Sequence, residues 1–160
     1  MDYWFSAHQT ANLAAEMESK GAAFYVYLQG VTDDATIADM CALLAEQEQE
    51  HRAKFLGISE FHRASDAEHC YSVDVCGMLQ ASMQALTEFL NENTAAAQKP
   101  PTVSECLSLA ARLEATSVSV YSKMIEKYAA GFTTVLADGL GEERKHLQMI
   151  QHVQSRMALT

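Results

Sequence analysis

One short pattern, a glutamate followed three residues later by a histidine, occurs twice in this chain and constrains its fold more than any other feature. The copies are Glu48 with His51 and Glu143 with His146. Residues three apart on a helix lie on one face about one turn apart, so each pair can bind one metal ion together. From the fourteen glutamates and six histidines of the sequence, chance would supply only about half a copy. The second copy therefore points to a functional pattern.

Each copy also has a further glutamate upstream at nearly the same distance. Glu18 precedes Glu48 by thirty residues, and Glu114 precedes Glu143 by twenty-nine. Each upstream glutamate is followed by a small residue at plus three and a tyrosine at plus seven, which are Gly21 and Tyr25 in one copy and Ser117 and Tyr121 in the other. This repeated spacing predicts two copies of a helical hairpin, each of which supplies one glutamate and then a Glu-x-x-His pair.

Helix is favoured along nearly the whole chain, which has only two prolines and seven glycines and is rich in Ala, Leu, Met, Glu and Gln. Capping boxes are predicted at Ser6 with Gln9 and at Thr102 with Glu105. From these and other start and stop signals, we expect the four main helices at about 6–30, 35–57, 102–130 and 133–157.

The connections between these helices predict their arrangement. Only a few residues separate the helices within each pair, so the paired helices should be antiparallel neighbours. The segment 58–100 is long enough to cross from one end of a bundle to the other, and 76–93 should form one amphipathic helix within it. We therefore predict an all-α four-helix bundle with an extra helix in its crossover, folded as a single domain over 1–160. Gly139 and Gly141 weaken the last helix, where we expect a kink or a close approach to a neighbour.

The acidic composition excludes several classes of partner. A formal charge of −10 and a pI near 4.9 argue against nucleic acid or an anionic membrane surface. No apolar run approaches the roughly 18 residues of a membrane span, and the first residues lack a basic flank, so we expect a soluble cytoplasmic protein. The cysteines contain no C-x-x-C pair, and we expect all four to be small buried hydrophobic residues: Cys41, Cys70, Cys76 and Cys106.

The repeated positions form the candidate metal site, which consists of Glu18, Glu48, His51, Glu114, Glu143 and His146. Its four carboxylates and two neutral imidazoles carry a charge of −4, which two divalent ions would cancel. The alternative is that each glutamate is solvated helix surface and each histidine a satisfied polar residue. The repeat favours metal binding over this alternative for the six positions.

Acidic and histidine residues outside the repeat are better explained as surface. Four glutamates lie one or two residues from a candidate and so should point elsewhere. We expect surface positions for Glu16, Glu46, Glu50, Glu142, His8, His62, His69 and His152. Tyr25 and Tyr121 fall two turns after the upstream glutamates on the same face, so they either hydrogen-bond a ligand carboxylate or are ordinary core tyrosines.

Four segments resemble the metal-binding helices of the rubrerythrin-like branch of the ferritin-like superfamily: EMESKGAAFY, LAEQEQEHRAKF, RLEATSVSVY and GEERKHL. The resemblance implies a ferritin-like four-helix bundle with a non-haem di-iron centre held by the six repeated residues. It further implies an oxidoreductase that reacts ferrous iron with hydrogen peroxide or oxygen, protecting the cell from oxidative stress or oxidising iron. In this scheme Glu48 and Glu143 bridge two irons, while one further glutamate and one histidine complete each iron. Such bundles are often dimers, and we expect a homodimer.

Two departures from the family bear on the function. The chain lacks the two C-x-x-C pairs of the family's rubredoxin module, so electrons would come from a separate donor such as a rubredoxin. Ser117 stands where rubrerythrins proper place a further glutamate. Four glutamates with two histidines resemble ferritin-type and other oxygen-activating centres equally well.

Other metals and other functions stay open at the level of the sequence. Iron is implied by the resemblance, whereas the ligand set itself also suits manganese and would take zinc. A non-catalytic iron-binding or storage protein is one alternative, with the acidic surface guiding cations inward. A bundle whose polar core only fixes the register of its helices is another.

Overall fold

The computed structural model describes residues 5–64, 70–71, 73–92, 101–127 and 133–158. Within these ranges the chain forms helices α1 (Ala7–Val31), α2 (Ala35–Ala64), α3 (Val73–Glu92), α4 (Val103–Lys127) and α5 (Thr133–Met157). The two-residue strands β1 (Phe5–Ser6) and β2 (Cys70–Tyr71) pair in antiparallel orientation. The predicted all-α class is therefore confirmed. None of the described helices contains a stretch long and apolar enough to cross a membrane.

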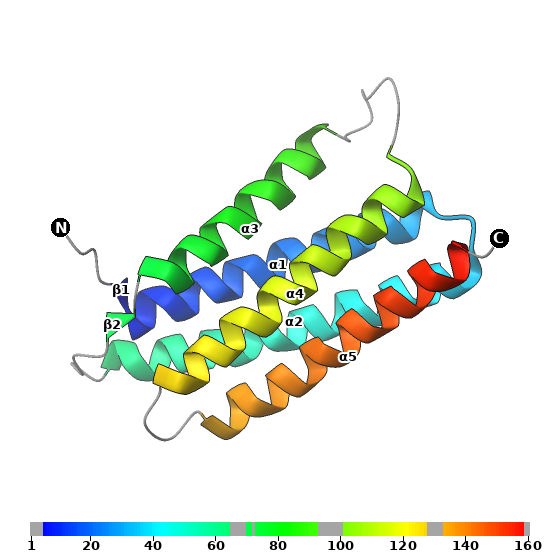
Figure 1. The fold of residues 1–160 in the computed structure, drawn as a ribbon. Coiled ribbons are helices and arrows are strands. Elements are labelled where there is room, and N and C mark those ends of the chain that lie inside the picture. The colour runs from blue at the N-terminus through cyan, green and yellow to red at the C-terminus, as the bar shows by residue number, and fades with distance from the viewer. Residues whose placement is uncertain (1–4, 65–69, 72, 93–100, 128–132, 159–160) are drawn as a thin grey trace.

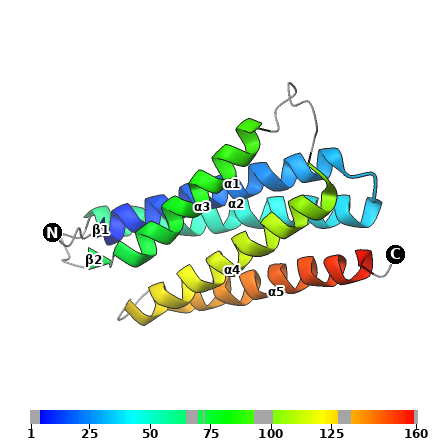
Figure 2. The same ribbon diagram turned by 45° about the horizontal axis from the view of Figure 1, so that its top comes forward.

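The helices are arranged as two hairpins that lie against each other. α1 and α2 form the first hairpin, and α4 and α5 form the second (Figure 1). The helix predicted between the hairpins is α3, which packs on α1 and α4 and lies on the side away from α5 in both views (Figures 1 and 2). α3 therefore covers one side of the seam between the two hairpins.

The helices begin at the residues that their capping signals predicted. At α1, the Gln9 N–H donates to the Ser6 hydroxyl at 3.1 Å, and the Ser6 N–H donates to the Gln9 side chain at 2.9 Å. At α4, Thr102 and Glu105 exchange the same two hydrogen bonds, at 2.8 and 3.2 Å. At α2, the carboxylate of Asp34 accepts from two backbone N–H groups of the first turn.

The predicted end of the second helix near Gly57 is wrong, because α2 continues to Ala64. Gly57 is exposed and costs a helix only about 1 kcal/mol relative to alanine. Beyond it, Ile58 is buried, which contributes roughly 1.5–3 kcal/mol. Ser59 is buried as well, and its hydroxyl donates to Asn12 on α1 at 2.8 Å. These contacts outweigh the glycine and extend the helix along α1.

His8 belongs to the same set of contacts and is not the surface residue that we predicted. It is half-buried, and its Nδ1–H donates to the Ser59 carbonyl oxygen at 3.0 Å. Its Nε2 accepts from the Asn12 side-chain amide at 3.2 Å. His8 therefore helps to hold the start of α1 against the end of α2. Among the other histidines predicted at the surface, His152 is exposed, His62 is half-buried, and His69 lies outside the described residues.

The apolar core consists of two clusters that leave a polar layer between them. The first cluster includes Met17, Phe55, Tyr121 and Leu136, and the second includes Phe24, Leu44, Leu107 and Ile150. Along each main helix the chain passes from one cluster to the other, and the repeated Glu and His positions lie at the transition. Three cysteines are buried as predicted, namely Cys41, Cys76 and Cys106, while the side chain of Cys70 lies outside the described residues.

Candidate metal centre

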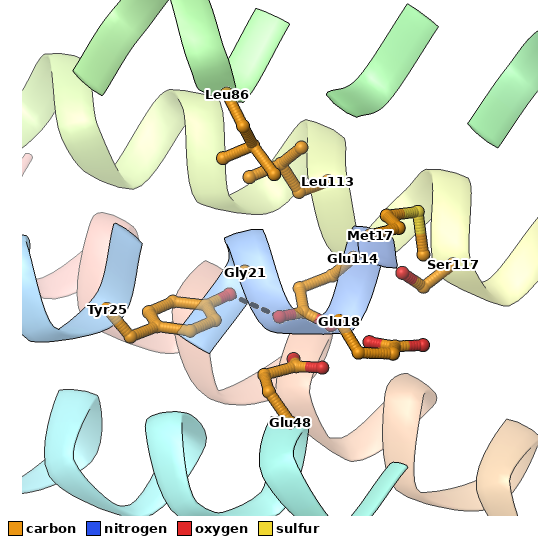
Figure 3. Close-up of a pocket in the computed structure, with 9 residues that line it drawn as sticks. All are labelled: Met17, Glu18, Gly21, Tyr25, Glu48, Leu86, Leu113, Glu114 and Ser117. Carbon is orange, nitrogen blue, oxygen red and sulfur yellow. Dashed lines mark hydrogen bonds between the residues drawn. The ribbon is translucent and has the colours of Figure 1, made fainter. Parts of the chain in front are cut away.

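The six repeated side chains meet in the polar layer between the two apolar clusters. α1 supplies Glu18, α2 supplies Glu48 and His51, α4 supplies Glu114, and α5 supplies Glu143 and His146. All six are buried, with at most 4 % of any of them exposed. Figure 3 shows the carboxylates of Glu18, Glu48 and Glu114 pointing toward one another from three different helices. The side chains converge because all six residues lie near the middle of their helices and the two hairpins pack against each other.

The donor atoms form two overlapping groups, each of which could hold one metal ion. One group is Glu18, Glu48, His51 and Glu143, and the other is Glu48, Glu114, Glu143 and His146. Within each group, one ligand atom from every residue lies within 4.8 Å of the others. Glu48 and Glu143 belong to both groups, so their two carboxylates stand between the two positions. The remaining glutamates and the two histidines each belong to one position.

The donor atoms that face the centre have no hydrogen-bond partner among the described residues. Each of the six residues contributes at least one such buried atom: Glu18 Oε1, Glu48 Oε2, His51 Nδ1, Glu114 Oε2, both oxygens of Glu143, and His146 Nδ1. A buried polar atom without a partner costs about 1–3 kcal/mol, and a charged one costs more. A set of six residues that aims such atoms at one place therefore fits bound metal, which would satisfy all of them at once.

Both imidazoles turn the same nitrogen toward the centre. His51 Nδ1 lies 2.6 Å from Glu143 Oε1, although the pair is not aligned as a hydrogen bond, and His146 Nδ1 lies 3.5 Å from Glu114 Oε2. Each Nε2 points outward and is bonded there. A neutral imidazole that donates through Nε2 keeps its lone pair on Nδ1. The outward hydrogen bonds therefore set the tautomer that a metal requires.

The outward partners come from the opposite hairpin in both cases. The His51 Nε2–H donates to Glu142 Oε2 at 2.7 Å, and the His146 Nε2–H donates to Gln47 Oε1 at 3.0 Å. The prediction that Glu142 is plain surface is therefore wrong. Glu142 is half-buried and also binds Lys54 at 2.7 Å. The other three glutamates predicted at the surface are exposed as expected: Glu16, Glu46 and Glu50.

The crowded carboxylates and imidazoles shift one another's pKa values. Burial raises the pKa of Glu18 and of Glu114 well above the usual value, and the nearby charge of Glu48 raises both further. Burial lowers the pKa of His51, but the facing carboxylates of Glu143 and Glu48 more than reverse this and raise it to about 10. Burial also lowers the pKa of His146, but the facing carboxylates of Glu114 and Glu143 raise it to about 10. Without metal, protons therefore neutralise the cluster.

Metal binding at neutral pH is expected to release up to four protons per chain, one each from Glu18, Glu114, His51 and His146. All four groups have raised pKa values, so the metal-free site holds protons that ions must displace. The combined affinity for two ions should consequently increase as the pH rises. Calorimetric titration with a divalent ion in two buffers of different ionisation enthalpy measures the number released. A count near zero would show that these four groups are already deprotonated in the metal-free site.

The two tyrosines of the repeat behave differently. The Tyr25 hydroxyl donates to Glu114 Oε1, which belongs to the other hairpin (Figure 3). The Tyr121 hydroxyl is buried and has no hydrogen-bond partner in the described part of the chain. Its ring packs on Phe55 with centroids 5.1 Å apart and lies 6.0 Å from the ring of His51. Of the two interpretations offered by the sequence, Tyr25 follows the first, a hydrogen bond to a carboxylate of the site, and Tyr121 the second.

This difference predicts opposite outcomes for one conservative change. Tyr25→Phe removes the donor to a buried carboxyl oxygen and should lower the free energy of unfolding of the metal-free protein by about 1–3 kcal/mol. Tyr121→Phe removes a hydroxyl that has no partner, so it should leave stability unchanged or raise it. Urea denaturation of both variants beside the wild type makes the comparison. Equal losses in the two variants would show that the Tyr25 hydrogen bond contributes nothing.

A small cavity lies directly beside the carboxylates. It has a volume of about 20 Å³ and is bounded on the site's side by Glu18, Glu48 and Glu114 (Figure 3). Leu86 from α3 and Leu113 from α4 bound its other side, together with Met17, Gly21, Tyr25 and Ser117. A space of this size holds roughly one water-sized molecule. The Ser117 side chain is one of the few polar groups that border this cavity.

Comparison of the chain with protein-family models, with curated proteins and with solved structures found no match in any of the three.

Proposed function

We propose that the chain is a non-haem di-iron oxidoreductase with a ferritin-like bundle, in which ferrous iron reacts with hydrogen peroxide or oxygen. The observation that carries this proposal is the set of buried donor atoms without partners, arranged in two groups that share two carboxylates. Shared carboxylates are what a pair of ions needs, because each can bridge both ions. The order of the elements, two hairpins joined through α3, supports the ferritin-like fold.

The residues take distinct roles in this proposal. Glu48 and Glu143 bridge the two positions, Glu18 and His51 complete one of them, and the other is completed by Glu114 with His146. Carboxylate oxygens with imidazole nitrogens suit iron or manganese, and zinc would also bind. Iron held at these positions would supply the electrons for the reaction, one from each ferrous ion. Each histidine is held in place by its outward hydrogen bond to the opposite hairpin.

The surroundings of the site favour a small oxidant. The apolar clusters lie on both sides of the carboxylates, and the adjacent cavity of about 20 Å³ has room for roughly one molecule close to water in size. Hydrogen peroxide and oxygen are much closer to this size than an organic substrate is. A separate donor such as a rubredoxin would return electrons after each turnover, and a homodimer is the expected assembly.

Rapid mixing of the ferrous protein with oxidants tests the proposal. Metal-free protein is loaded anaerobically with two ferrous ions per chain and then mixed with hydrogen peroxide or oxygen. We expect a fast change in near-ultraviolet absorbance with at least one oxidant, together with oxidation of both irons in Mössbauer spectra. No change with either oxidant would exclude the redox function. Retention of many more than two irons per chain after oxidation would indicate storage instead.

A further inference from the structure

The two histidines of the centre differ in the chemistry of their outward partners. His51 donates to a carboxylate, Glu142 Oε2 at 2.7 Å, whereas His146 donates to an amide, Gln47 Oε1 at 3.0 Å. The two partners occupy the same place in the repeat, because each directly precedes a glutamate shared by both metal positions. The hairpins are thus alike in geometry at this point and unlike in charge.

A second contact accompanies the carboxylate and fixes it. Lys54 lies one turn after His51, and its ammonium group donates to the same oxygen of Glu142 at 2.7 Å. The side chains of Lys54 and Glu142 are each about one-third exposed, so the pair lies at the outer edge of the site. The corresponding residue one turn after His146 is Met149, which carries no charge. The first position therefore has an ion pair behind its histidine, and the second has a neutral amide.

We infer that the two metal positions bind ions with unequal affinity and that the position containing His51 fills first because Glu142 is the outer partner of its imidazole. A carboxylate acceptor strengthens the hydrogen bond from Nε2 and makes Nδ1 a better electron donor than an amide acceptor does. Lys54 cancels much of the long-range charge of Glu142, so the effect passes mainly through the imidazole. This inference rests on the proposed function, since it requires two ions at the centre.

Exchange of the two outer partners tests the inference. Metal-free protein is titrated anaerobically with Co²⁺, and binding is followed by calorimetry and by visible absorbance. The wild type should bind two ions in separate steps. Glu142→Gln should weaken the tighter step by about 10- to 100-fold, and Gln47→Glu should strengthen the weaker step by a similar factor. The variant with both changes should reverse the order, so that His146→Ala in that background removes the tighter step.

Lys54→Met separates an electronic effect from a structural one. This change leaves His51 as the remaining donor to Glu142 Oε2 and should strengthen the tighter binding step. If the ion pair served only to hold the structure together, removal of either Lys54 or Glu142 would weaken metal binding. Tyr25 donates to Glu114 of the other position and could also make the two affinities unequal. The test of the inference is therefore the change in each binding step in the variants, and not the presence of two steps in the wild type. Unchanged steps in Glu142→Gln, or equal weakening of both, would overturn the inference. Failure of the wild type to bind two ions would instead overturn the proposed function.

Discussion

Replacement of both shared carboxylates, Glu48→Ala with Glu143→Ala, is expected to reduce bound metal from two ions per chain to none. These two residues belong to both donor groups, so their loss leaves each position with one glutamate and one histidine. Two ligands do not hold a divalent ion against water at micromolar concentrations. Elemental analysis of protein purified from iron-supplemented cells gives the measurement. Glu18→Ala removes a donor from one position only and should lower the content toward one ion.

A surface glutamate on the same helix provides the control for this experiment. Glu46 is exposed on α2 two residues before Glu48, and Glu46→Ala should retain both ions. Circular dichroism before and after chelation establishes that the double variant is folded. A folded double variant with unchanged metal content would refute the candidate centre. It would leave the interpretation in which the polar layer only fixes the register of the helices.

Gly139→Ala is expected to destabilise the protein by about 1–3 kcal/mol, although alanine normally favours a helix. A Cβ atom at Gly139 would lie 3.0 Å from Cζ of Tyr121 and closer still to its Cε1. Tyr121 is buried between Phe55 and His51, so its ring cannot move aside without disturbing the site. The close approach expected from the sequence at this glycine is thereby confirmed. Urea denaturation of the metal-free variant measures the loss.

Gly141→Ala is the matched control, two residues further along α5. No atom of the described residues lies within 4 Å of a Cβ built there, apart from its chain neighbours and helix backbone. The change should therefore stabilise the protein by up to about 1 kcal/mol through helix propensity alone. Opposite signs for the two glycines are the expected result. Equal stabilisation by both changes would show that the Tyr121 ring yields freely.

Local and repeated signals were sufficient to predict much of the fold. Capping boxes such as Ser6 with Gln9 place helix starts because their hydrogen bonds involve only neighbouring residues. The spacing of Glu18 from Glu48 and of Glu114 from Glu143 brings the candidate ligands to one depth once each hairpin is antiparallel. The tyrosine at plus seven likewise identified Tyr25, since helical periodicity puts it on the face of Glu18.

Contacts between the hairpins could not be predicted in the same way. Glu142 directly precedes Glu143, so its side chain leaves α5 on a different face from that of Glu143. His51 of the opposite hairpin nevertheless donates a hydrogen bond to it. The only signal in the sequence was the polar residue before both shared glutamates, Gln47 and Glu142. The end of α2 was missed for a related reason. The contact that carries the helix beyond Gly57 comes from Asn12, which is distant in the chain.

The interleaving of donors from both hairpins has a consequence for the chain as a polymer. Every four-residue group includes at least one member of each hairpin, and Glu48 and Glu143 are separated by 95 residues. An ion bound there holds the two hairpins together and binds only states in which they are docked, so it stabilises the folded chain by mass action. Withdrawal of the ion removes that stabilisation. Resistance to proteolysis should then follow the metal supply of the cell, so that starved chains are degraded before loaded ones.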